Sequence, residues 1–450
     1  MIMSSNLSLY KSIIMSTINQ SFPRRIKPLE EPLGLYLRPG HNDHKLVCQV
    51  LSEGLSFTTG VVFDGSYVDE QEELRHEVNR RSLWSVIDPR SMELSTPGGL
   101  TERRKSLPWG ADKPHTASQL AGTNGDRHAD LIVEFALEHE FSAILSPAHF
   151  LHKGYADEWF QVDLALAQRI KSQLALAGRT DIALFYPLAI PTKVFFDPAQ
   201  RAALKQALIS RAHVDELWLR VHPFGGHSGH VTLARYIQAA RDLHDLPYAI
   251  IGEKVGTLGL ALLAFGAVSG IEVGVSSGES FNVGRLAKRS ASKKGFAPHR
   301  GIYLSTLGLQ LNRYEASKLF ENRSLKASHT CQNPKCCREG SIGMLSNPRR
   351  HFVISRMSEV SGISSQPPTV RPTEFLEQHL RPATDRLVRA INADIPKTLK
   401  TKLERERGRL EGWRNTLGEM SRNQPLSRVA RTPNRRTRVD AKNSSQARPS

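Results

Sequence analysis

The sequence is poor in cysteine, with four among 450 residues. Three of the four fall within the seven residues from Cys331 to Cys337, a spacing typical of metal ligands rather than of a disulfide framework. No apolar run approaches the roughly 18 residues that a membrane span needs. The first 25 residues also lack the apolar core and small-residue cleavage site of a signal peptide. These absences predict a cytoplasmic protein without a membrane partner.

Acidic residues are scarce relative to basic ones, since 44 Asp and Glu stand against 61 Lys and Arg, for a net charge of +17. This balance favours a polyanionic partner, because each neutralised phosphate releases counterions. Part of the excess lies in residues 421–450, where Asp440 is the one acid against eight basic residues. The low apolar content of this segment predicts a disordered tail. A nucleic-acid contact and a merely solvated tail both remain open.

Short apolar runs that end in polar residues recur eight times between residues 33 and 283, with helical patterns between them. Runs such as Val61–Phe63 and Leu217–Val221 suit strands that are buried on both faces. No Gly-rich phosphate motif follows any of these runs, which argues against a doubly wound open sheet. Eight strand–helix units over roughly 250 residues predict an α/β fold of the (β/α)8 TIM-barrel type.

Composition divides the chain further. We expect a C-terminal zinc-binding insert and a helical, basic tail after the barrel. The predicted parts are an irregular leader (1–32), the (β/α)8 barrel (33–283), a basic segment with a zinc-binding subdomain (284–370), a helical extension (371–420) and a disordered basic tail (421–450).

Polar residues at the ends of the eight predicted strands should converge on one mouth of the barrel, where the chemistry of this fold takes place. Carboxylates and imidazoles at such a mouth can act as acid, base, nucleophile or ligand. Taken singly, each is equally explained as a residue of the barrel interior with a satisfied hydrogen bond. The substrate-binding candidates are Asp64, Arg90, His149, His222, Glu253 and Lys254.

Histidines at the strand ends support a different prediction, a catalytic metal that activates water. The triplet His41-Asn42-Asp43 is similar to the His-x-Asp at the first strand of metal-dependent amidohydrolases and dipeptidases. Polar strand ends account for the same histidines without a metal. The histidines concerned are His41, His149, His152, His222 and His227.

The cysteine cluster predicts a structural zinc site. Cys331, Cys336 and Cys337 supply three thiolates, and His351 follows after a further 13 residues. Three Cys and one His make a closed tetrahedral zinc set. His329, two residues before the first cysteine, competes as the fourth ligand, and three unligated thiols are the alternative.

The order of these features resembles the tRNA-guanine transglycosylase superfamily, whose members exchange guanine for a 7-deazaguanine in tRNA and, in one branch, in DNA. In that family the last barrel strand reads Gly-Ile-Asp-x-Phe-Asp, and a basic segment, a short strand and a zinc insert with three cysteines and a histidine follow. Here the same order is Gly270–Val275 (GIEVGV), the basic residues 285–300, Gly301–Leu304 and the Cys–His group. The resemblance covers about Leu33 to Glu359.

Three departures from the family pattern affect the site. Val275 stands where the family has its nucleophilic Asp, and the Asp-Ser-Gly-Gly-Phe motif is matched by Asp88 alone. The cysteine spacing is Cys-x4-Cys-Cys instead of Cys-x-Cys-x2-Cys. Side chains alternate along a strand, so Glu272, three residues before Val275, is expected to face the helices. The catalytic candidates are Asp88, Glu272 and Glu279.

The resemblance implies a pentosyltransferase that exchanges a guanine-like base in tRNA or DNA, with a 7-deazaguanine-like base as the small substrate and structural zinc as the cofactor. A metal-dependent TIM-barrel hydrolase and a non-catalytic nucleic-acid-binding relative are the alternatives. The sequence leaves the oligomeric state open, with a homodimer as one option. The residues predicted to contact nucleic acid are Arg285, Lys288, Arg289, Lys293, Lys294 and Arg300.

Overall fold

The computed structural model describes residues 33–54, 57–275, 280–287 and 301–423, apart from the side chain of Arg285. All of these residues belong to one compact unit. The predicted leader (1–32) therefore lies outside the described residues. The tail predicted from residue 421 begins as the last turn of a helix that ends at Asn423, and its other residues also lie outside.

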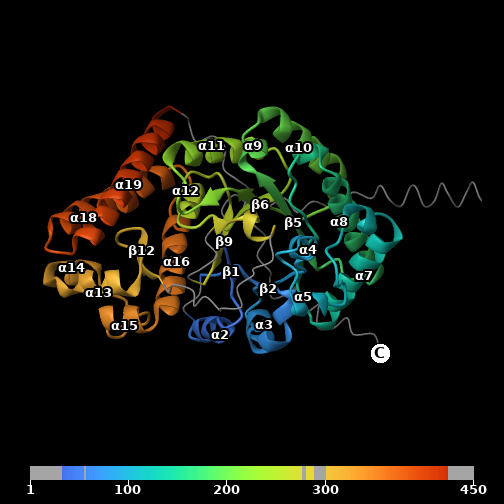
Figure 1. The fold of residues 1–450 in the computed structure, drawn as a ribbon, viewed down its shortest axis with the longest axis horizontal. Coiled ribbons are helices and arrows are strands. Elements are labelled where there is room, and N and C mark those ends of the chain that lie inside the picture. Colours follow the sequence, from blue (N-terminus) through green and yellow to red (C-terminus); the bar gives the residue numbers. More distant parts are fainter. Residues whose placement is uncertain (1–32, 55–56, 276–279, 288–300, 424–450) are drawn as a thin grey trace, which may run out of the picture. The chain divides into compact units, whose positions relative to one another are not determined.

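Eight parallel strands close into a barrel (Figure 1), which confirms the predicted TIM-barrel fold. β9 pairs with β1 in parallel, from Gly34 opposite Gly270 to Arg38 opposite Gly274, and this pairing closes the barrel. In order around the barrel the strands are β1 (Gly34–Arg38), β2 (Gly60–Asp64), β3 (Trp84–Asp88), β4 (Ala143–Leu145), β5 (Ala183–Pro191), β6 (Glu216–His222), β8 (Ala249–Glu253) and β9 (Gly270–Gly274).

Helices surround the barrel on its outer side (Figure 1). Seven of them follow barrel strands in the chain, whereas α16 comes from the region after the barrel and contacts both α12 and α2. α16 thus takes the place of the eighth barrel helix. The helices are α2 (His44–Ser52), α3 (Glu72–Arg80), α7 (Thr123–Glu138), α8 (Glu158–Leu176), α10 (Pro198–Arg211), α11 (His230–Arg241), α12 (Leu258–Ala264) and α16 (Pro348–Ser364).

Local sequence signals set the start of these helices, as α10 illustrates. The carboxylate of Asp197 accepts hydrogen bonds from the backbone N–H groups of Ala199 (2.8 Å) and Gln200 (3.2 Å). Pro198 occupies the first helical position, where its missing N–H costs nothing. The cap satisfies donors that have no partner within the helix.

Short elements fill the loops at the carboxyl ends of the strands. β7 and β10 pair there in antiparallel fashion, with Gly225 opposite Ser280 and Phe224 opposite Phe281. The elements are α4 (Ser91–Leu94), α5 (Glu102–Lys105), α6 (Ala117–Leu120), α9 (Thr192–Phe195), β7 (Phe224–Gly225), β10 (Ser280–Phe281) and the 3₁₀ turns η1 (Gly65–Tyr67), η2 (Asp69–Gln71), η3 (Gly154–Ala156) and η4 (Val283–Arg285).

The interior of the barrel is filled by aromatic and aliphatic side chains. The rings of Tyr36 and Trp218 lie 4.8 Å apart, and Phe185 stacks on Trp218 at 5.7 Å. The buried carboxylate of Glu216 accepts hydrogen bonds from the Tyr36 hydroxyl (3.1 Å) and the Trp218 indole N–H (3.0 Å). A buried carboxylate with such partners avoids the cost of an unsatisfied charge.

The region after the barrel is helical apart from one hairpin, as far as the structure describes it. No helix among the described residues is long and apolar enough to cross a membrane. The elements are β11 (Ile302–Leu304), β12 (Leu309–Leu311), α13 (Arg313–Glu321), α14 (Arg323–His329), α15 (Ser341–Ser346), α17 (Arg371–Glu374), the π-helix η5 (Phe375–Leu380), α18 (Arg381–Asn392) and α19 (Lys397–Asn423).

α19 packs against α18 and α11 through buried side chains that alternate at spacings of four and three residues (Figure 1). Its polar side chains also contact the loop between β6 and α11. Arg409 Nη1 donates to the Gly226 carbonyl at 2.5 Å, and the indole N–H of Trp413 donates to the Ser228 carbonyl at 3.3 Å. The C-terminal helix therefore holds a loop at the mouth end of the barrel.

Replacing Trp413 tests how far α19 stabilises the fold. Trp413 is 3% exposed, so Trp413→Ala should lower the free energy of unfolding by about 3–5 kcal/mol through the cavity it leaves. Leu176→Ala is the matched control, because Leu176 is 79% exposed and its loss should cost less than about 0.5 kcal/mol. Urea unfolding measures both values, and equal losses would mean that α19 is not part of the core.

Candidate functional site

Three carboxylates from different strands meet one guanidinium at the carboxyl end of the barrel. Arg38, the last residue of β1, donates from Nη1 to Asp88 Oδ2 (2.5 Å) and from Nε to Glu272 Oε1 (2.7 Å). Its Nη2 donates to Glu253 Oε1 at 3.2 Å. The side chain of Arg38 is 11% exposed, so these are largely desolvated ion pairs. The strand ends of β1, β3, β8 and β9 are thereby joined at one point.

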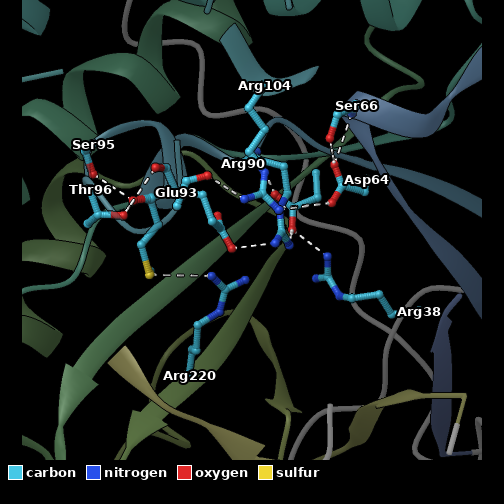
Figure 2. Close-up of polar contacts among 12 residues, drawn as sticks. Arg38, Asp64, Ser66, Arg90, Glu93, Ser95, Thr96, Arg104 and Arg220 are labelled. Carbon is cyan, nitrogen blue, oxygen red and sulfur yellow. Dashed lines mark hydrogen bonds and ion pairs between the residues drawn. The ribbon is translucent and has the colours of Figure 1, made fainter. Parts of the chain in front are cut away.

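A second arginine, Arg90, forms ion pairs with three carboxylates of this charged mouth. Arg90 Nη2 lies 2.6 Å from Glu93 Oε1, Nε lies 3.2 Å from Asp64 Oδ2, and Nη1 lies 3.4 Å from Asp88 Oδ2. The backbone of Arg90 has a φ of +60°, which is uncommon for a residue with a side chain, and its N–H donates to Asp88 Oδ1 at 2.9 Å. Figure 2 shows Arg38, Arg90 and Arg220 pointing toward the same space.

The arginines determine the ionisation of the mouth. Burial by itself would raise the pKa of Asp88, but the charges of Arg38, Arg90 and Arg220 outweigh it and hold this pKa well below the ordinary value. The pKa of Glu253 is lowered in the same way, against its burial, first by Arg220 and then by Arg38. Both carboxylates are therefore ionised at neutral pH.

Lys254 differs from the arginines in its ionisation. Burial, followed by the charges of Arg220 and Arg38, lowers its pKa to about 8, and Glu253 opposes this shift. Its backbone N–H donates to Glu272 Oε2 at 3.1 Å, and its φ is +54°. The mouth thus contains one amine that changes its charge close to physiological pH.

The structure corrects the expected orientation of Glu272. Glu272 lies opposite Tyr36 on β1 and opposite Glu253 on β8, and all three side chains point into the barrel. Ile271, Val273 and Val275 alternate with it and pack into the outer core beneath the helices. The prediction that Glu272 faces the helices is therefore wrong, because it took Val275 as the inward-facing residue. Glu279, the other candidate from this region, lies outside the described residues.

The two predicted substrate-binding histidines have separate structural partners. His149 Nδ1 lies 2.6 Å from Asp163 Oδ1, and its ring stacks on Trp159 at 3.6 Å. His222 Nδ1 lies 3.1 Å from the Phe281 carbonyl. Among the described residues the strand-end histidines form no group that could hold a metal ion. The metal-dependent hydrolase stays a prediction, and no group of strand-end histidines among the described residues supports it.

The cysteine cluster and one histidine do come together. The Sγ atoms of Cys331, Cys336 and Cys337 and a ring nitrogen of His351 all lie within 4.8 Å of one another. The two adjacent sulfurs are 3.7 Å apart, and each lies 3.4 Å from His351 Nδ1. Sulfur atoms that bind one tetrahedral zinc ion at about 2.3 Å are separated by about 3.7 Å, so the spacing fits zinc.

The surroundings of His351 suit a metal ligand. Its Nε2 donates to the Tyr303 carbonyl at 2.9 Å, which leaves Nδ1 free to bind a metal. His329, the competing candidate, instead bonds the Thr306 hydroxyl at 2.9 Å and is not part of the group. His351 lies on α16, so the same helix supplies a ligand and completes the helical ring.

Sequence reasoning missed three charged residues of the mouth, namely Arg38, Glu93 and Arg220. Arg38 ends β1, and Arg220 lies inside β6 in the otherwise apolar run LWLRV. A basic residue within an apolar strand is a usable signal, because it requires a buried anion nearby. The predicted nucleic-acid contacts cannot be placed: Lys288, Arg289, Lys293, Lys294, Arg300 and the side chain of Arg285 lie outside the described residues.

No known family model matches this chain, and no curated protein sequence matches it. Among solved structures, the endo-1,4-beta-xylanase XylE of Penicillium canescens is 11% identical with a TM-score of 0.36, over 53% of this chain and 81% of that one. The GH26 beta-mannanase BoMan26A of Bacteroides ovatus is 13% identical with a TM-score of 0.34, over 54% and 81%. The carboxyl transferase domain of Rhizobium etli pyruvate carboxylase is 9% identical with a TM-score of 0.34, over 88% and 62%. Similarity at this level carries no information about the reaction.

Removing Arg38 tests the charge balance of the mouth. Arg38→Met leaves three buried carboxylates without their shared cation, so the free energy of unfolding should fall by about 3–5 kcal/mol. Arg169→Met is the control, because Arg169 pairs with Asp130 where both side chains are about one-third exposed, and its loss should cost about 0–1 kcal/mol. Urea unfolding at pH 7 compares them, and equal values would contradict the role given to Arg38.

Metal analysis tests the cysteine–histidine group. The purified chain should contain one equivalent of zinc, and Cys336→Ser should lose it and unfold at a lower temperature. Cys48→Ser is the matched control, since Cys48 lies on α2 apart from the group, and its zinc content should be unchanged. If the purified chain contained no metal and melted at the same temperature as Cys336→Ser, a structural zinc would be ruled out.

Proposed function

We propose that this chain is a base-exchange enzyme of the transglycosylase type, which replaces a guanine-like base in tRNA or DNA. The observation that carries the proposal is a pair of carboxylates, Asp88 and Glu272, that contact the same Arg38 guanidinium in the barrel mouth. Two carboxylates at one site are what displacement at a sugar C1′ requires. The order of barrel, short strand and cysteine–histidine group is a second, independent support.

In this mechanism Glu272 is the nucleophile. One of its oxygens attacks C1′, the C1′–N bond breaks, and the departing base takes the electron pair. Glu272 Oε1 contacts Arg38, and Oε2 accepts the Lys254 N–H, so the attacking oxygen leaves one of these contacts. The negative charge on the departing base develops among cationic side chains, which lowers the barrier electrostatically. These side chains are Arg38, Arg90, Arg220 and Lys254.

Asp88 acts in the return step. The incoming base carries an N–H where the new bond to C1′ must form, and Asp88 removes that proton as Glu272 leaves the sugar. Asp88 then releases the proton to solvent, from which the departed base takes the proton that its freed nitrogen needs. A base must be ionised for this task, and the neighbouring arginines keep Asp88 ionised at neutral pH, while the same charges weaken it as a proton acceptor. Zinc at the cysteine–histidine group would stabilise the fold in the region after the barrel and would take no part in the reaction.

Label exchange tests the proposal. The full chain is incubated with radiolabelled guanine and either tRNA or duplex DNA, and one of the two nucleic acids should retain label. Asp88→Asn should slow the exchange by about 10²–10⁴-fold through loss of the base. Glu272→Gln should slow it by about 10⁴–10⁶-fold through loss of the nucleophile. Glu102→Gln is the control, because the Glu102 side chain is 89% exposed, and its rate should equal that of the unaltered chain.

The other outcomes of this assay are decisive as well. Release of base without incorporation of label would support a hydrolase in place of an exchange enzyme. Tight, salt-dependent binding of nucleic acid with neither release nor exchange would support the non-catalytic relative. Equal rates for Glu272→Gln and Glu102→Gln would remove Glu272 as the nucleophile.

A further inference from the structure

Two cationic side chains in the mouth contact the same aromatic ring. The Arg220 guanidinium carbon is 5.7 Å from the centre of the Phe281 ring, and Lys254 Nζ is 5.9 Å from it. Phe281, on β10, is buried and packs against Phe150 at a ring distance of 5.9 Å. The ring therefore contacts one cation from β6 and one from the residue directly after the neighbouring strand β8.

Arg220 has more hydrogen-bond donors than partners. Its side chain is 4% exposed, and only Nη2 has an anionic hydrogen-bond partner, the Glu253 carboxylate. Among the described residues, the hydrogen-bond contact of Nη1 is with Met92 Sδ at 3.9 Å (Figure 2), and the buried Nε has no hydrogen-bond partner. A buried guanidinium with unused N–H groups carries a desolvation cost that a ligand oxygen would remove.

Lys254 and Ser91 add unused donors near Arg220. Within the part of the chain that the structure describes, the Lys254 ammonium group has no hydrogen-bond partner. Ser91 Oγ is buried and also has none. Ser91 and Arg220 line the same cavity of about 10 Å³, which is room for about one water-sized group. Asp88 and Glu93 line this cavity as well, so an oxygen atom there would meet the donors of Ser91 and Arg220 beside two carboxylates, whereas Lys254 lies outside its lining.

We propose that Arg220 and Lys254 form an oxyanion subsite of the barrel mouth, which binds a carboxylate or phosphate group of the ligand. Arg220 offers a planar fork of N–H groups, which matches either anion. Lys254 adds a point charge that contacts the same Phe281 ring as Arg220. The subsite does not depend on base exchange, because any reaction at this mouth would use it to hold an anionic ligand.

The affinity of the subsite for an anion should depend on pH, because Lys254 changes its charge. The pKa of about 8 means that the ammonium form dominates below pH 8 and the neutral amine above it. An anion therefore binds more tightly below pH 8 and more weakly above. The charged groups that face Lys254 are Arg220 of β6, Arg38 of β1, Arg90 after β3, Glu253 of β8 and Glu272 of β9.

Calorimetric titration of the full chain tests the subsite with two probes, benzoate and inorganic phosphate, at low salt and pH 7. At least one probe should bind with a stoichiometry of one. Lys254→Gln should weaken this binding at least about tenfold, the equivalent of 1.4 kcal/mol. Lys153→Gln is the matched control, because Lys153 is an exposed lysine of the loop after β4. The affinity of this variant for the probe should equal that of the unaltered chain.

A benzoate titration between pH 6.5 and 9.5 on the unaltered chain gives a second measurement, which needs no variant to fold. The affinity of the chain for benzoate should fall as the pH rises through about 8. In Lys254→Gln the affinity should depend less on pH. Binding of benzoate alone assigns the subsite to a carboxylate, and binding of phosphate alone assigns it to a phosphate group. Binding of neither probe, or equal binding by Lys254→Gln, would overturn the proposal. Anion binding without label exchange would retain the subsite and reject the proposed function.

Discussion

The charge balance around Arg38 is the constraint on which the barrel mouth depends. This guanidinium contacts Asp88, Glu253 and Glu272, which come from three other strands. Each carboxylate would be costly to bury alone, and the shared cation offsets part of that cost for all three. Because the four strand ends lie around a closed barrel, the network fixes them relative to one another. A mouth held in this way needs little rearrangement when charge develops on a substrate.

α16 connects the second polar centre of the molecule to the barrel. It takes the place of the eighth helix against α2 and α12, and it carries His351 of the cysteine–histidine group. A metal bound there would fix the start of the helix that closes the outer ring. Stability of the barrel and occupancy of the metal site are therefore linked through one element. α19 makes a comparable connection at the other end, since Arg409 and Trp413 hold the loop after β6.

Local patterns predicted the fold and the grouping of three cysteines with His351 well, and the mouth only in part. Asp88, Glu253 and Lys254 were recognised because each follows an apolar run in the sequence. The inward orientation of Glu272 was missed, since alternation along a strand gives relative facing but not which set points inward. Only the pairing of β9 with β1 and β8 settled that question. Arg220 escaped notice because its partner is distant in the chain.

The sequence by itself determined the eight barrel strands, the seven helices between them and the cysteine–histidine spacing, because apolar periodicity and ligand spacing are properties of short segments. Tertiary structure alone decided which strand-end charges meet, which helix closes the ring and that Arg220 and Lys254 both contact the Phe281 ring. These outcomes depend on barrel closure and on the register of strands far apart in the chain. A pattern within one strand cannot specify the residue that lies opposite it.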